Sequence, residues 1–202
     1  MAFIASAALD ARAAEVWRRH RLAAGFDAEA LLDALGLGLL WEVLPDPPEG
    51  GSVWGALLAH ERTVVLNEAH LQVLNENEGL RRFTIAHEVG HWLLHADAIR
   101  AGTVPMLSGG RTWCRGGSGD PERQAEMFAG RLLIPQDLLS DVLPGAGWQG
   151  WPPVYGLAET FAVTASAMLR RLEELNLAHR DVSGIPRSGR AGTPGQGVLF
   201  AD

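Results

Sequence analysis

Two spacings of apolar residues alternate along this chain, and each predicts a type of element. The helical spacing occurs at about 8–24, 27–35, 78–96 and 120–135. Shorter β-rich runs lie at 37–44, 53–60 and 63–67. The last two runs meet at Glu61 and Arg62, which predicts a β-hairpin. We therefore expect an α+β fold in which a small three-stranded sheet packs on helices. An edge strand of that sheet could hold an extended peptide, although every open sheet has such an edge.

The helix at 78–96 contains the pattern His-Glu-x-x-His, with its histidines at His87 and His91. Histidines four residues apart lie on one side of a helix, about 6 Å apart along its axis, so both can reach one Zn²⁺ at about 2.0–2.1 Å. Glu88 can then take a proton from a water at the open position of the metal, and that water can attack a peptide carbonyl. Because the pattern is short, a buried helix with two hydrogen-bonded histidines is the alternative.

Two further residues of this helix need an explanation. Gly90 lowers helix stability by about 1 kcal/mol relative to alanine, and we expect it where another strand or the metal packs closely. His95 follows His91 by four residues and continues the ligand face. It could contact the substrate or its oxyanion, or it could close the C-terminus of the helix, where a partly charged imidazole is favourable.

The helix at 120–135 supplies a third metal ligand. Glu122 and Glu126 are four residues apart and share one helical face. Two such carboxylates could be solvated charges, but downstream of a His-Glu-x-x-His helix a metal role fits better. We expect Glu122 to bind the metal and Glu126 to accept the spare ring N–H of a ligand histidine, which fixes its tautomer. Two histidines, one glutamate and an open position are typical of hydrolytic zinc sites.

Together these motifs resemble the ImmA/IrrE metallopeptidases, bacterial and phage-associated zinc proteases related to thermolysin. The resemblance rests on residues 82–91, on the spacing Glu122-x-x-Ala125-x-x-Phe128-Ala129, and on Leu-Leu-Ile-Pro at 132–135. It extends over about residues 10–180. The family usually has asparagine or aspartate where this chain has Glu126.

The resemblance implies a zincin-like, gluzincin-type core and a narrow substrate. That substrate would be a helix-turn-helix transcriptional repressor or an antitoxin-like regulator, cut in a stress or mobile-element response. His87, His91 and Glu122 would hold Zn²⁺, with Mn²⁺ as an alternative, and Glu88 would also protonate the leaving amine. Two non-enzymatic functions stay open: a DNA-binding regulator with a structural or sensory metal, and a protein that binds its target without cutting it.

Residues 157–172 resemble a helix-turn-helix, with a turn at Ala162 and Val163 and with Thr164 as the N-cap of its second helix. The exposed start of that helix, 165–167, has only small residues and offers no arginine or asparagine to contact bases. The formal net charge of −7 also argues against a phosphate-binding surface. We therefore expect no direct DNA binding. The family resemblance implies instead that this segment packs on the core or binds a protein partner.

The length of 202 residues indicates one domain, or one domain with a small appendage. We expect a zincin-like domain at 1–150, a helix-turn-helix-like segment packed on it at 151–182, and a flexible tail at 183–202. All 17 basic residues are arginine, which says little about function.

Cys114 is the sole cysteine, so we expect no internal disulfide and a reducing compartment. The chain has no charged leader before an apolar stretch and no run of about 18 apolar residues, so we expect a cytoplasmic protein without a membrane segment. Cys114 lies in a Gly/Ser-rich stretch at 96–119 that we expect to be a loop near the metal. Its thiolate could occupy the open metal position as an inhibitory switch, or it could be an incidental thiol.

Overall fold

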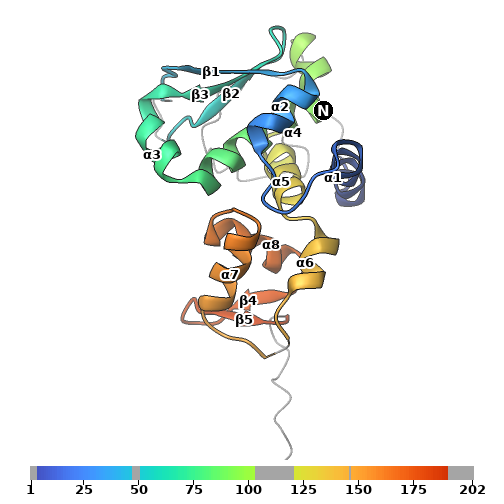
Figure 1. Ribbon diagram of the computed structural model, residues 1–202, viewed down its shortest axis with the longest axis vertical. Helices are drawn as coiled ribbons and strands as arrows, with labels where there is room; N and C mark the ends of the chain where they lie inside the picture. The colour runs from blue at the N-terminus through green and yellow to red at the C-terminus, as the bar shows by residue number, and fades with distance from the viewer. Residues whose placement is uncertain (1–3, 47–50, 103–120, 146, 191–202) are drawn as a thin grey trace, which may run out of the picture.

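The structure, a computed structural model, describes residues 4–46, 51–102, 121–145 and 147–190. The fold is α+β, as predicted, with a small sheet packed on helices (Figure 1). The chain forms, in order, α1 (Ser6–His20), α2 (Ala28–Leu35), β1 (Gly38–Glu42), β2 (Gly55–Leu58), β3 (Thr63–Asn67), the 3-10 turn η1 (Glu68–His70), α3 (Leu71–Glu76) and α4 (Glu78–Arg100). It continues with α5 (Pro121–Leu133), α6 (Gln136–Val142), α7 (Pro152–Thr160), α8 (Ala165–Glu174), β4 (Ala178–Arg180) and β5 (Pro186–Ser188).

The three-stranded sheet has the strand order β1-β3-β2, so β3 is central and β2 is an edge strand. The antiparallel pairing of β2 with β3 confirms the predicted hairpin, and β1 runs parallel to β3. Val64, Val65 and Leu66 of β3 are almost completely buried, as expected for a central strand. On β2, a Cβ at Gly55 would lie 2.7 Å from Thr84 Cγ2, so only glycine allows this edge strand to approach α4 so closely.

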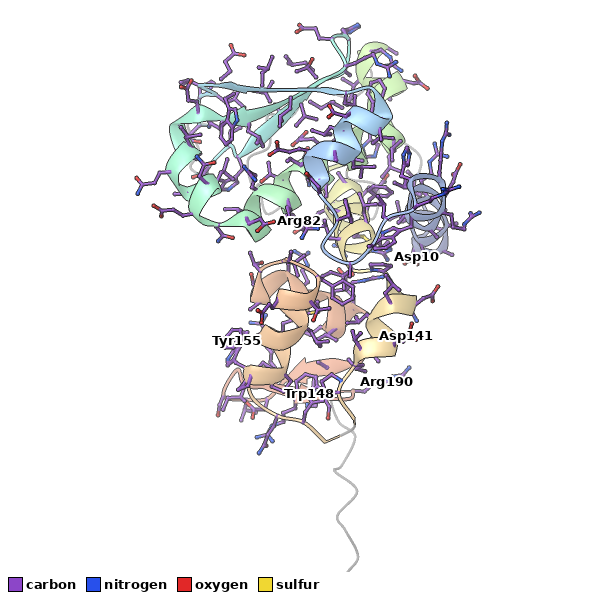
Figure 2. The ribbon with its side chains drawn as sticks, in the orientation of Figure 1. Asp10, Arg82, Asp141, Trp148, Tyr155 and Arg190 are labelled. Atoms are coloured by element: carbon purple, nitrogen blue, oxygen red, sulfur yellow. The ribbon has the colours of Figure 1, made fainter. Side chains whose placement is uncertain are left out.

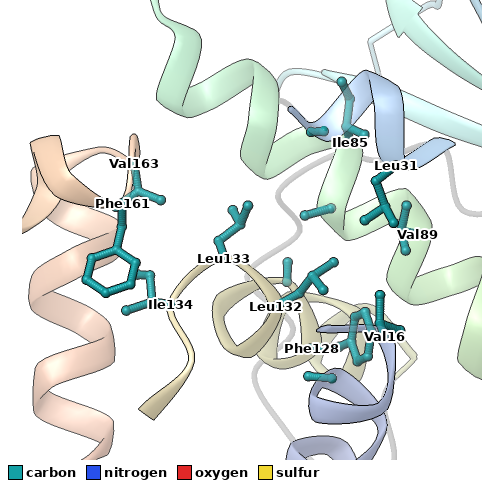
Figure 3. Packing of buried hydrophobic residues seen from close by; sticks show 14 of the residues in the cluster. Val16, Leu31, Ile85, Val89, Phe128, Leu132, Leu133, Ile134, Phe161 and Val163 are labelled. Carbon is teal, nitrogen blue, oxygen red and sulfur yellow. The ribbon is translucent and has the colours of Figure 1, made fainter. Parts of the chain in front are cut away.

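The main core lies between the sheet and the helices α1, α2, α4 and α5. Figure 3 shows Ile85 and Val89 of α4 beside Leu31 of α2, and Phe128 of α5 beside Val16 of α1. Phe128 and Val89 have no exposed surface. Burial of a side chain of this size stabilises the fold by about 1.5–3 kcal/mol, so α4 and α5 are firmly held where they carry the predicted ligands.

Buried Arg82 connects α4 to the turn of the helix-turn-helix segment (Figure 2). Its guanidinium donates to the carbonyl oxygens of Phe161 and Phe26, each at 2.8 Å, and also to that of Ala162. A Cβ at Gly79 would lie 2.8 Å from the backbone nitrogen of Thr164, so the start of α4 is packed directly against this turn.

The predicted helix-turn-helix is present as α7 and α8. Ala162 has a positive φ of 48° in the turn, and the Thr164 hydroxyl accepts a hydrogen bond from the N–H of Ala167, as an N-cap does. The prediction that this segment packs against the rest of the protein is consistent with the contacts of Arg82.

Two segments differ from the predictions. Helix α4 continues to Arg100 because Ala96 and Ile99 extend its buried face beyond the expected end. Part of the stretch expected as a flexible tail forms β5, which pairs antiparallel with β4 and is fastened by an ion pair between Arg187 and Asp181. Cys114 and residues 191–202 of the predicted tail lie outside the described residues. Among the helices of the described ranges, none is long and apolar enough to cross a lipid bilayer.

Candidate metal centre

Helix α4 brings the two histidines of the motif together. The helix starts after Asn77, whose side chain accepts a hydrogen bond from the N–H of Leu80 at 3.0 Å. One turn separates His87 from His91, and their Nε2 atoms lie 3.0 Å apart. Two lone pairs at that distance repel each other, so a proton or a cation between them is needed for stability.

The first turn of α5 places Glu122 against both rings. One carboxylate oxygen lies 3.2 Å from His87 Nε2, and the other lies 3.1 Å from His91 Nε2. The side chains of these three residues are between 7% and 15% exposed, with His87 the most exposed. The predicted ligands therefore form one largely buried cluster that keeps a small exposed fraction.

Gly90 explains how α5 can come close enough. A Cβ at this position would lie 3.1 Å from both the Cα and the carbonyl oxygen of Ala125. The close packing expected around this glycine is therefore with a second helix, not with a strand or the metal. Without a side chain at Gly90, the backbones of α4 and α5 touch, and Glu122 reaches the histidines.

The three residues fit a divalent cation. Donor atoms about 2.0–2.1 Å from a tetrahedral Zn²⁺ lie about 3.3 Å from one another. The two histidine nitrogens lie 3.0 Å apart, and each lies 3.1 or 3.2 Å from a different oxygen of Glu122, separations close to this value. All the donor atoms lie within 4.8 Å of one another, as a shared metal ligand set requires. Two imidazoles and one carboxylate leave a fourth position for a water or a substrate oxygen.

The electrostatics of Glu122 favour its ionised form. Burial acts to raise its pKa, but the hydrogen bonds with His87 and His91 and their charges outweigh this effect and lower the pKa to about 2. The carboxylate is therefore ready to bind a cation at any physiological pH.

The pKa of Glu88 is shifted in the opposite direction from that of Glu122. Only 2% of the residue is exposed, and burial raises the pKa of its carboxyl group even though His87 and His91 act to lower it. A carboxylate with a raised pKa is a better proton acceptor. This environment suits the role of general base that the motif predicted for Glu88.

The contacts of Glu126 do not match its predicted role. Its carboxylate accepts hydrogen bonds from the guanidinium of Arg170 on α8, and none of the hydrogen bonds found for the described residues joins it to a ligand histidine. Arg170 on α8 is thus its hydrogen-bond partner, although the charge of Glu126 still acts to raise the pKa of His87. The assignment of Glu126 as the residue that orients a ligand histidine stays a prediction.

His95 lies next to His91 in the protein interior. Only 1% of the residue is exposed, its Nδ1 lies 3.2 Å from His91 Nδ1, and its Nε2 lies 3.2 Å from Gln124 Oε1. Burial is the main reason that the pKa of His95 falls to about 4, so the ring is neutral at pH 7. Neither expected role, substrate contact or closure of the helix C-terminus, fits this position in the interior of α4.

Gln124 was missed by the sequence analysis. It is 2% exposed and lies on the face of α5 that packs against α4, next to the apolar residues Ala125 and Phe128. A glutamine within an apolar stripe was the available signal, since a buried amide needs a polar partner.

Two comparisons with known proteins show what this chain is similar to. Metallopeptidase ImmA of Bacillus subtilis (strain 168) is 31% identical over 88 residues, which are 44% of this chain and 46% of that protein. A solved structure described as a Mycobacterium tuberculosis transcriptional regulator has a TM-score of 0.54 at 19% identity, covering 91% of this chain and 55% of that one. At that identity the likeness concerns the fold alone. The chain thus matches about half the length of each relative.

The family comparison covers the whole candidate site. Residues 59–173 match the IrrE N-terminal-like domain of the peptidase M78 family. This range contains His87, Glu88, His91 and Glu122, and it is more than half of the 202 residues. The chain therefore belongs to the IrrE N-terminal-like peptidase M78 family, which confirms the resemblance found in its motifs.

Proposed function

We propose that this protein is a zinc-dependent endopeptidase that hydrolyses a bond in one specific intracellular protein. The observation that carries the proposal is the convergence of His87, His91 and Glu122 on one point, with Glu88 buried beside them. Family membership supports a metal-dependent peptidase. A helix-turn-helix repressor or an antitoxin-like regulator is the substrate we propose, following the family resemblance.

The residues divide the chemistry between them. His87, His91 and Glu122 would hold the metal, which supplies Lewis-acid polarisation of the scissile carbonyl and the attacking water. Glu88 takes the proton of that water and then gives it to the leaving amine. The raised pKa of Glu88 supports both steps. It makes the carboxylate a better acceptor of the water proton, and it lets the carboxyl group hold that proton until the amine leaves.

The edge of the sheet offers a place for the substrate backbone. Among the described residues β2 pairs with β3 alone, and its Gly55 packs against Thr84, about one turn before His87 on α4. We propose that an extended stretch of the substrate pairs with the other edge of β2 by β-augmentation. Such pairing would hold the peptide beside the metal ligands.

The contacts of α8 speak against DNA binding as its main role. Arg171 is 3% exposed and donates to the carbonyl oxygen of Ile134. Arg170 is paired with Glu126 and Glu174. Arg171 is therefore engaged inside the protein, and the half-exposed Arg170 is partly neutralised by two carboxylates.

The decisive experiment uses Glu88→Gln. Glutamine has the same shape but cannot accept the proton, so we expect the variant to bind zinc as the wild type does and to cleave about 10²–10⁴ times more slowly. Purified zinc-loaded protein is incubated with the regulator encoded beside its gene, and the fragments are identified by mass spectrometry. Glu76→Gln, an exposed change on α3, is the matched control.

The outcomes separate the alternatives. Equal cleavage by Glu88→Gln and wild type would overturn the mechanism. Stable binding of the regulator without cleavage by the wild type would favour the sensory protein that binds but does not cut. If the wild-type protein binds no zinc, the proposed zinc site is contradicted. Titration with Mn²⁺ then tests the alternative metal.

A further inference from the structure

Behind the three candidate ligands lies a second line of buried polar groups. It runs from His91 on α4 to His95 one turn later and then across to Gln124 on α5. Both His95 and Gln124 are at most 2% exposed. Buried polar groups are costly unless they are hydrogen-bonded, so an arrangement of this kind needs a reason.

Counting hydrogens along this line leaves two consistent arrangements. Each of the two contacts contains one hydrogen, and a neutral imidazole carries one N–H. In the first arrangement His91 Nδ1–H donates to His95 Nδ1, and His95 Nε2–H donates to Gln124 Oε1. In the second, every bond is reversed: the Gln124 amide donates to His95, and His95 donates to His91.

Only the first arrangement is compatible with a metal. It leaves the Nε2 lone pair of His91 free to point at His87 and Glu122. The second arrangement puts the hydrogen of His91 on Nε2, where it blocks coordination. In the structure Gln124 presents its oxygen to His95, and its amide nitrogen has no hydrogen-bond partner among the described residues. The line is thus arranged for metal binding.

We propose that His95 and Gln124 are positioning residues that fix the metal-binding tautomer and the orientation of His91. Because Gln124 presents an acceptor oxygen, His95 donates to Gln124 and His91 donates to His95. This inference rests on the proposed metal site, and it assigns to Gln124 and His95 the orienting role that the sequence had suggested for Glu126.

The test compares Gln124→Glu with Gln124→Met. Both side chains have nearly the length of glutamine, but glutamate keeps an acceptor oxygen and methionine does not. Zinc affinity is measured by competition with a chromophoric chelator, and no substrate is needed. We expect Gln124→Met to weaken zinc binding about tenfold, and Gln124→Glu to bind at least as tightly as the wild type. Gln72→Met, on the exposed surface of α3, should leave the affinity unchanged.

A double-mutant cycle connects the two positions. His95→Phe should weaken zinc binding about 10–100-fold, and adding Gln124→Met to it should have little further effect, because Gln124 acts only through His95. Additive effects would show that the residues act separately and would overturn the inference.

A spectroscopic measurement tests the arrangement in the unaltered protein. Nitrogen NMR of the zinc-loaded wild type should show His95 protonated at Nε2 and His91 protonated at Nδ1. His95 protonated at Nδ1, or equal zinc affinities for Gln124→Met and Gln124→Glu, would contradict the proposal. A wild type without zinc affinity would instead contradict the proposed function, so the two failures are distinguishable.

Discussion

Two carboxylates of one site, Glu88 and Glu122, are held in opposite ways. Burial raises the pKa of Glu88, whereas the hydrogen bonds of Glu122 lower its pKa to about 2 in spite of burial. Because the pKa of Glu88 is raised by folding, this residue lowers the stability of the protein once the pH exceeds the pKa of Glu88 in the unfolded chain. Because the pKa of Glu122 is lowered by folding, this residue contributes stability at a pH above its pKa in the unfolded chain. That contribution is lost as the pH falls towards 2. Opposite shifts of this kind separate the groups of a site by role.

The two isosteric variants should therefore change stability in opposite directions. In metal-free protein at pH 7, we expect Glu88→Gln to raise the free energy of unfolding and Glu122→Gln to lower it, the latter by about 1–3 kcal/mol. Urea denaturation with a chelator present measures both. At pH 4 the gain from Glu88→Gln should have nearly vanished, while the loss from Glu122→Gln should largely persist. Changes of the same sign in both variants would contradict this account.

At the scale of elements, the site depends on the spacing of α4 and α5. The glycine between the two histidines allows the helix backbones to touch, and that contact carries Glu122 to the rings. Gly130 is also inside a helix, but a Cβ there would meet no atom within 4 Å. The two glycines therefore give a matched pair in which only one has a packing role.

Alanine at these two positions should have opposite effects. Gly90→Ala gains about 1 kcal/mol of helix propensity but forces apart two packed backbones, at a cost of about 1–3 kcal/mol, so we expect a net loss of stability together with weaker zinc binding. Gly130→Ala should stabilise the protein by up to about 1 kcal/mol and leave zinc binding unchanged. Thermal denaturation and a zinc titration measure both. Unchanged zinc affinity in Gly90→Ala would show that helix spacing does not set the site.

The sequence predicted the ligand set but not what lies behind it. His87, His91 and Glu122 follow from spacing along two helices, because a helix fixes which residues share a face. Gln124 and the position of Glu126 depend on how α5 is rotated against α4 and on the partner that α8 provides. Such contacts between elements leave no periodic signal. The same reason explains β5, whose Gly/Ser/Pro-rich surroundings suggested a flexible tail until pairing with β4 was visible.

At the scale of the whole molecule, one buried arginine joins the metal-binding helix to the helix-turn-helix segment. Arg82 donates hydrogen bonds to backbone carbonyl groups in two segments. One is that of Phe26, between α1 and α2, and the others are those of Phe161 and Ala162, in the turn between α7 and α8. Within the part of the chain that the structure describes, its neighbour Arg81 has a partly exposed ion pair with Glu29, at 3.4 Å. Adjacent residues of the same type thus have very different structural roles.

Methionine at these positions should reveal that difference. Arg82→Met leaves buried carbonyl groups without donors, and we expect it to cost about 2–4 kcal/mol of stability. Arg81→Met should change stability by no more than about 0.5 kcal/mol. Denaturant unfolding measures the cost, and hydrogen exchange should show faster exchange in the 161–164 turn of Arg82→Met alone. Equal costs for the two variants would show that the junction is not held by Arg82.

Because the ligands lie on two different helices, metal binding should stabilise the folded chain against unfolding. His91 and Glu122 are separated by 31 residues of chain, and closing a loop of that length costs an unfolded chain about 3–4 kcal/mol of conformational entropy. The folded protein has already made this closure, so the ion binds the folded chain far better than the unfolded one. At a free metal concentration 100 times the Kd, the fold gains about 2.7 kcal/mol. Metal-starved copies would unfold more often and be degraded sooner, so the metal supply would control how much of this protein persists.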